Sequence, residues 1–124
     1  MIILDTEVVI EVTDKNSDET GQILERLETA GDEVVITSLS LHEILYGFGQ
    51  YGKERIKGLE LLPVLNFEDR DAVMSADIEI AAERRGQDLS RIDAMIAAMA
   101  INRKAKLFTF DRKHFENIPD LELF

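Results

Sequence analysis

The sequence contains no cysteine, which excludes disulfides, thiolate metal sites and cysteine nucleophiles. This absence also fits a cytoplasmic protein, because cytosolic proteins seldom depend on disulfides. No apolar run approaches the roughly 20 residues that a membrane-spanning helix needs. The first eight residues lack a basic segment and already include an acid, so we expect neither a signal peptide nor a membrane partner. The glycine-rich GxxxxGKS loop is missing too, so no phosphate-binding loop of that kind is expected.

The length of 124 residues suits one domain, and we expect residues 1–124 to share a single core. Short runs rich in β-branched and apolar residues alternate with segments of helical periodicity. The runs that predict strands are 1–4, 33–37, 62–67, 106–110 and 121–124. The segments that predict helices are 17–30, 38–48, 53–61, 68–86 and 90–104, with a helical turn at 114–117. Residues 6–12 are compatible with either type. This alternation predicts an α/β fold whose mostly parallel sheet is covered on both faces.

The net charge of −11 argues at first sight against a nucleic-acid partner. The charge is unevenly distributed, however. Residues 84–113 hold eight basic and three acidic residues, a local charge of +5, whereas the remainder holds six basic and 22 acidic residues, or −16. On charge alone we favour an ordinary acidic surface with basic helix ends. The sharper interpretation is a basic rim that binds a polyanion.

Four acidic residues are predicted to meet at one edge of the sheet. Asp5 and Asp111 each follow a predicted strand, and the carboxyl ends of parallel strands lie at a common edge. Asp93 lies three residues after Ser90, a candidate N-cap, so it is expected in the first turn of a helix at that edge. Glu43 lies three residues after Ser40 in a capping-box pattern, which places it similarly.

Each acid alone has an ordinary explanation as a helix cap or a partner of the helix dipole, worth roughly 0.3–1 kcal/mol. Together, crowded carboxylates raise one another's pKa and favour binding of a divalent cation. Oxygen ligands without cysteine suit Mg²⁺ or Mn²⁺ rather than zinc. Such an ion activates water for attack on a phosphodiester. His42 is expected to be a surface or cap residue rather than a ligand. His114 lies beside Asp111 and could touch substrate, but we expect it to be a solvated loop residue.

At this point the sequence resembles the PIN-domain ribonucleases, and among these the VapC-type toxins of type II toxin–antitoxin pairs. The resemblance spans nearly the whole chain. It rests on Ile3–Thr6, on Ser40–Glu43 with Gly47, on Arg91–Ala98, and on Thr109–Asp111 with Phe115.

The resemblance implies a three-layer α/β/α fold and Mg²⁺- or Mn²⁺-dependent endonucleolytic cleavage of RNA. It implies that the family's acidic quartet, which is catalytic and binds the metal, corresponds to Asp5, Glu43, Asp93 and Asp111. Thr109 matches a family position that orders the last of these acids. A homodimer and an inhibiting antitoxin protein are implied as well. One departure is Glu7, because the family usually has Asn or Ser two residues after the first acid.

The residues that we predict to contact substrate phosphates or lie beside them are Thr109, Arg84, Arg85, Arg91, Arg112 and Lys113. The alternative hypothesis is a catalytically silent PIN-like module that binds protein, which Glu7 and the acidic surface motivate. A phosphatase or a receiver domain is a weaker alternative, because Asp5-Thr6-Glu7 lacks the DxD pattern and the acid pair of receivers is missing.

Overall fold

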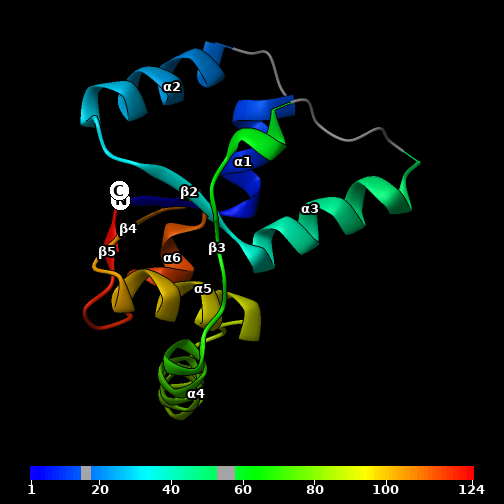
Figure 1. The fold of residues 1–124 in the computed structure, drawn as a ribbon. Helices are drawn as coiled ribbons and strands as arrows, with labels where there is room; N and C mark the ends of the chain where they lie inside the picture. Colours follow the sequence, from blue (N-terminus) through cyan, green and yellow to red (C-terminus); the bar gives the residue numbers. More distant parts are fainter. Residues whose placement is uncertain (15–17, 53–57) are drawn as a thin grey trace.

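A computed structural model describes residues 1–14, 18–52 and 58–124, and it forms a five-stranded sheet flanked by helices (Figure 1). The strands are β1 (Ile2–Leu4), β2 (Val34–Thr37), β3 (Val64–Leu65), β4 (Lys106–Phe108) and β5 (Glu122–Leu123). The helical elements are α1 (Thr6–Asp14), α2 (Asp18–Ala30), α3 (Ser38–Gln50), the 3-10 turn η1 (Leu59–Leu61), α4 (Asp69–Arg84), α5 (Arg91–Asn102) and α6 (Arg112–Phe115). The strand order is β3-β2-β1-β4-β5 with every pair parallel, which confirms the predicted α/β fold.

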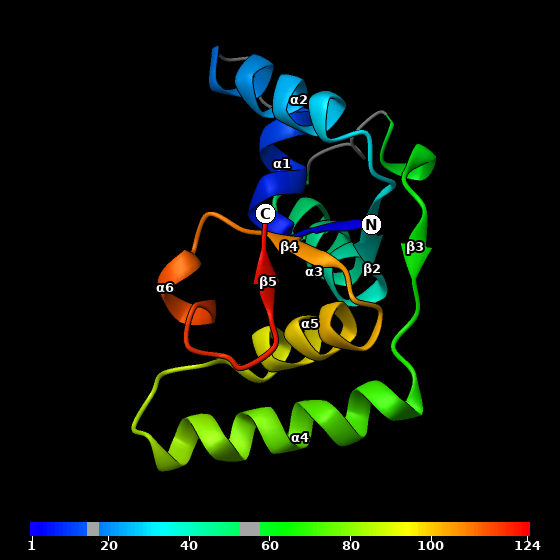
Figure 2. The same cartoon turned by 90° about the vertical axis from the view of Figure 1, so that its left-hand side faces the viewer.

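The central strand β1 divides the core between the two faces of the sheet, because successive side chains of a strand point to opposite faces. Ile2 and Leu4 are buried in a cluster with residues of α1, α2 and α3, whereas Ile3 is buried in a second cluster with residues of α5. Figures 1 and 2 show helices on both sides of the sheet, with α4 outside α5. Three layers therefore bury the short central strands on both faces.

A buried ion pair holds α4 against α5. The Asp71 side chain is fully buried, and it accepts hydrogen bonds from Arg103 Nη1 at 2.9 Å, Arg103 Nη2 at 3.0 Å and Asn102 Nδ2 at 2.8 Å. Burial alone would raise the pKa of Asp71. The hydrogen bonds from Arg103, Asn102 and the Glu68 backbone outweigh burial and lower the pKa below 3.8.

Several local predictions differ from the structure. Residues 6–12 are helical, because Val8 and Val9 gain burial in the core as part of α1. The N-cap of α3 is Thr37, whose side chain accepts a hydrogen bond from Ser40 N at 3.0 Å, so the predicted cap at Ser40 is wrong. Strand β4 ends at Phe108, two residues earlier than predicted.

Two predicted helices reach residues whose structure is not described. The first is the helix predicted over 17–30, whose start at Ser17 lies outside the described residues. The second is the helix predicted over 53–61, of which residues 53–57 also lie outside the described residues. Residues 59–61 of this second helix form the 3-10 turn η1. Strand β3 covers only two residues of the predicted 62–67. Among the residues that the structure describes, none of the helices is long and apolar enough to cross a membrane.

Candidate metal centre

Strands β1 and β4 deliver the first two acids to one edge of the sheet, and a threonine connects them. Asp5 directly follows β1, and its backbone N–H donates to the Phe108 carbonyl at 2.9 Å. The buried Thr109 hydroxyl donates to Asp5 Oδ2 at 2.8 Å and accepts from the backbone N–H of Asp111 at 3.0 Å. One hydroxyl thus orients the Asp5 carboxylate and the backbone that carries Asp111.

A second threonine connects Asp5 to Glu43. Thr6 donates its backbone N–H to Asp5 Oδ1 at 2.9 Å and its hydroxyl to Glu43 Oε1 at 3.0 Å. Because α3 begins at Ser38, Glu43 lies beyond the first turn and cannot take part in a capping box. The ordinary explanation for Glu43 is therefore removed. Sequence reasoning did not assign Thr6 this role, and its position directly after Asp5 was the available signal.

Asp93 reaches the same edge from the N-terminus of α5. Its backbone N–H donates to Ser90 Oγ at 3.1 Å, which confirms Ser90 as the N-cap. Burial raises the pKa of Asp93 above 3.8, and the charges of Asp5 and Asp111 raise it further. The hydrogen bond with Ser90 and the neighbouring His114 oppose this rise. The charges of Asp5 and Asp111 therefore both act on the Asp93 carboxylate.

His114 belongs to this acidic edge, contrary to its expected role as an ordinary surface residue. Its Nδ1 atom lies 2.7 Å from Asp111 Oδ2, three residues earlier on the turn that forms α6. The i to i+3 spacing was the sequence signal, and it was visible only if a helical turn began at Asp111. His42 instead stacks on Tyr46 of α3, with 6.3 Å between the ring centroids.

Among the described residues, the basic side chain that contacts the four acids is His114, which lies beside Asp111. Over the described ranges, no lysine or arginine forms an ion pair with Asp5, Glu43, Asp93 or Asp111. Over the same ranges, no three acidic or histidine side chains lie close enough together to hold a metal ion jointly. A Mg²⁺ ion keeps several waters and binds one or two carboxylates. The donor set therefore fits a hydrated hard cation rather than a dry protein cage.

The predicted phosphate contacts are mostly engaged elsewhere. Arg91 pairs with Glu79 at 3.2 Å, Arg85 donates to Gln87 Oε1 at 2.9 Å, and Arg112 donates to the Phe124 carbonyl at 2.9 Å. In the part of the chain that is described, Arg84, Lys113 and Glu7 are exposed and have no hydrogen bond or ion pair.

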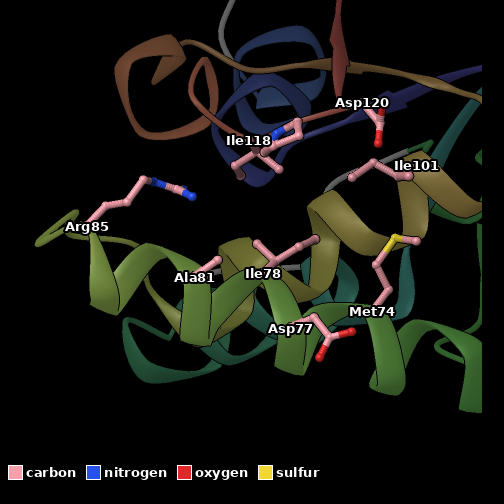
Figure 3. Close-up of a pocket in the computed structure, with 9 residues that line it drawn as sticks. Met74, Asp77, Ile78, Ala81, Arg85, Ile101, Ile118 and Asp120 are labelled. Atoms are coloured by element: carbon pink, nitrogen blue, oxygen red, sulfur yellow. The ribbon is translucent and has the colours of Figure 1, made fainter.

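An apolar cavity of about 260 Å³ lies between α4, α5 and the loop before β5, away from the four acids (Figure 3). Met74, Ile78 and Ile101 form apolar parts of its wall, and Arg85 reaches its edge. Arg85 therefore lines this cavity and not the space between the acids.

The sequence and the fold both match known proteins. A family model described as "PIN domain" matches residues 2–121. The tRNA(fMet)-specific endonuclease VapC of Salmonella typhimurium is 30% identical over 127 residues, covering 98% of this chain and 94% of that protein. Ribonuclease VapC2 of Rickettsia felis is 27% identical over 127 residues, with the same two shares covered. The crystal structure of VapBC2 from Rickettsia felis bound to a DNA fragment from its promoter matches with a TM-score of 0.82 and 26% identity, over 100% of this chain and 98% of that chain.

Proposed function

Because the chain belongs to the PIN domain family, we propose that it is a metal-dependent endoribonuclease that hydrolyses RNA phosphodiester bonds as the toxin of a toxin–antitoxin pair. The observation that carries the proposal is the arrangement of the acids at one edge, where Thr109 joins Asp5 to Asp111 through two hydrogen bonds. Asp93 enters the same edge, and its pKa is raised by burial and further by the charges of Asp5 and Asp111. A protein tolerates like charges at one edge when a bound cation compensates them. The relatives named above are a ribonuclease and a tRNA-specific endonuclease, each matched over 94% of its length, which supports the same chemistry here.

The residues proposed to hold Mg²⁺ or Mn²⁺ are Asp5, Glu43, Asp93 and Asp111. When bound, the ion supplies an activated water and stabilises the charge that develops on the phosphate. Thr109 holds one oxygen of Asp5 and the backbone of Asp111 and so orients both acids before substrate arrives. Thr6 does the same for the other oxygen of Asp5 and for Glu43. His114 orients the Asp111 carboxylate at 2.7 Å.

The proposal includes an antitoxin protein as partner, a homodimeric state and a cytoplasmic location. The structure of VapBC2 from Rickettsia felis, a toxin–antitoxin complex, supports the antitoxin. The negative charge at the acidic edge determines which charge the antitoxin must carry where it binds there. A segment that neutralises the acidic edge in place of a metal must be basic.

Replacing Asp93 by Asn tests the proposed function, because the amide keeps the shape of the side chain and removes its charge. We expect metal-stimulated cleavage of total RNA to fall by a factor of at least about 100. Asp77→Asn is the matched control, because Asp77 lies on α4 beside the apolar cavity. Cleavage by Asp93→Asn at the parent rate would rule out the proposed mechanism.

The second candidate is a catalytically silent PIN-like module that binds protein. The absence of a complete metal shell among the described side chains favours it. A parent protein that binds neither Mn²⁺ nor Mg²⁺ and cleaves no RNA, yet forms a complex with its antitoxin, would establish this alternative.

A further inference from the structure

A second cavity lies next to the acidic edge and is chemically different from the apolar cavity of Figure 3. It has a volume of about 300 Å³ and lies between α2, the end of β4 and the C-terminus. Its wall includes Gln22, Arg26, Phe110, Arg112 and also Thr109, the residue that joins Asp5 to Asp111. A molecule in this cavity would therefore lie one side chain away from the proposed metal ligands.

Arg26 is unusual among the basic residues of this chain. Its guanidinium stacks on Phe108 at 5.0 Å and on Phe124 at 4.9 Å, measured from Cζ to the ring centroids. Throughout the described part of the chain it has no carboxylate partner and no hydrogen bond. This is unexpected, because the net charge is −11 and α2 itself carries several acids. The two rings hold the guanidinium in place and leave its N–H groups available for a ligand.

Phe110 adds an exposed aromatic surface to the same wall. Its side chain is 46% exposed, although it lies beside the candidate metal ligand Asp111. The Phe110 ring meets the buried Phe108 ring edge to face, with 6.0 Å between their centroids. Arg112 lies beside it and is held by the Phe124 carbonyl at 2.9 Å. The cavity thus combines an exposed ring with two held cations, Arg26 and Arg112, and a single acid, Glu19.

We propose that this cavity is a nucleotide subsite, in which the base next to the scissile phosphate stacks on Phe110 and Arg26 binds a flanking phosphate. The inference rests on the proposed ribonuclease function and extends it to substrate recognition. Single-stranded RNA is recognised by stacking of splayed bases on aromatic rings and by arginine contacts to the backbone. A volume of about 300 Å³ lies at the lower end for small-molecule sites and suits one nucleotide. A docking peptide helix would instead require a long apolar groove.

Binding without cleavage tests the subsite. The probe is a labelled single-stranded RNA oligonucleotide containing all four bases, titrated in EDTA and followed by fluorescence anisotropy. We expect Phe110→Ala to weaken binding roughly tenfold, because it removes one base-stacking surface. Tyr51→Ala is the control, because Tyr51 is an exposed aromatic residue at the end of α3 and should leave the affinity unchanged. Arg26→Lys keeps the charge but loses the planar stacking, and we expect it to weaken binding several-fold.

A second measurement separates base stacking from an indirect structural effect. The chain contains no tryptophan, so Phe110→Trp places a single tryptophan in the cavity, and excitation at its long-wavelength edge avoids the two tyrosines. Its fluorescence should be quenched by the RNA, and an abasic nucleotide at one position should remove the quenching. The same abasic nucleotide should weaken binding to the parent but not to Phe110→Ala.

The outcomes distinguish the subsite from the catalytic proposal. Equal affinity of the parent and Phe110→Ala for the RNA, including no affinity in either, overturns the subsite even if the parent cleaves RNA. Failure of the parent to cleave RNA overturns the proposed function, yet a tenfold difference in binding still supports the subsite. If Phe110→Ala prevents formation of the antitoxin complex and leaves RNA affinity unchanged, the cavity belongs to the protein partner and the subsite is wrong.

Discussion

Asp71 and Asp93 occupy equivalent positions in neighbouring helices, yet their environments are opposite. Each is the third residue of its helix, after the N-caps Glu68 and Ser90. Asp71 accepts two hydrogen bonds from Arg103, and its pKa lies below 3.8 despite burial. Asp93 is partly buried near Asp5 and Asp111, and its pKa lies above 3.8. The position of an acid within its helix therefore does not determine the direction in which its pKa shifts. The charged groups that the fold places around the carboxylate determine that direction.

The difference indicates which acid stabilises the protein and which one costs stability. A carboxylate whose pKa is lowered by folding stabilises the native state at neutral pH, whereas one whose pKa is raised destabilises it. Asp71 thus joins α4 to α5. Asp93 is expected to lower the free energy of unfolding when no cation is bound. Such a cost in stability is typical of residues that are kept for function.

The largest expected effect is the loss of Asp71. Asp71→Ala would leave the guanidinium of Arg103, which is only 9% exposed, without its buried partner and with only the more distant Glu68 carboxylate at 3.4 Å. We expect the free energy of unfolding to fall by about 3–5 kcal/mol, as when one partner of a buried ion pair is removed. Urea denaturation measures it, and Asp69→Ala in the same first turn is the control. Equal losses in the two variants would contradict a special role for Asp71.

The two acids should also respond oppositely to pH. The stabilisation by Asp71 is present above its unfolded pKa of 3.8 and is lost as the pH falls through its lower native pKa. The penalty from Asp93 is present at neutral pH and disappears as the pH falls through its raised pKa toward 3.8. Unfolding of Asp71→Asn, Asp93→Asn and the parent at several pH values measures both. As the pH falls, the loss in free energy of unfolding of Asp71→Asn relative to the parent should become smaller. The gain in free energy of unfolding of Asp93→Asn should become smaller as well. Differences that do not vary with pH would contradict the assignment.

The smallest expected effect is the gain of stability in Asp93→Asn at neutral pH without metal. Removing one of three like charges should raise the free energy of unfolding by an amount on the order of 0.5 kcal/mol, the scale of partly exposed charge interactions. Asp77→Asn provides the baseline for an exposed acid away from this edge. A clear loss of stability in Asp93→Asn would mean that Asp93 has a structural role instead.

The order of the main elements was predictable from the sequence, because apolar strands and capped helices leave local patterns. Ser90 and its helix show this, and the family resemblance is confirmed by the match to residues 2–121. Residues 6–12 were compatible with a strand or a helix, because their β-branched residues favour strands. The helix is formed because it buries Val8 and Val9 in the core, and this tertiary contact is not visible in the sequence. The cap at Thr37 was missed because the serine motif beginning at Ser40 matched the same pattern.

The candidate site was only partly predictable for a related reason. The four acids were identified individually, but the threonines that connect them, Thr6 and Thr109, act across 37 and 104 residues of sequence. Arg26 was not identified at all, because its two aromatic neighbours come from β4 and the C-terminus. Contacts of such separation leave no periodic signal in one sequence.

Titration of Mn²⁺ by calorimetry into the metal-free parent and Asp93→Asn tests the central claim most directly, because it measures the cation that the acidic edge is proposed to bind. The prediction is one saturable binding process in the parent and a loss of affinity of at least about tenfold in Asp93→Asn. The same binding isotherm in both proteins, or no binding to the parent, would contradict the assignment of this edge as a metal site.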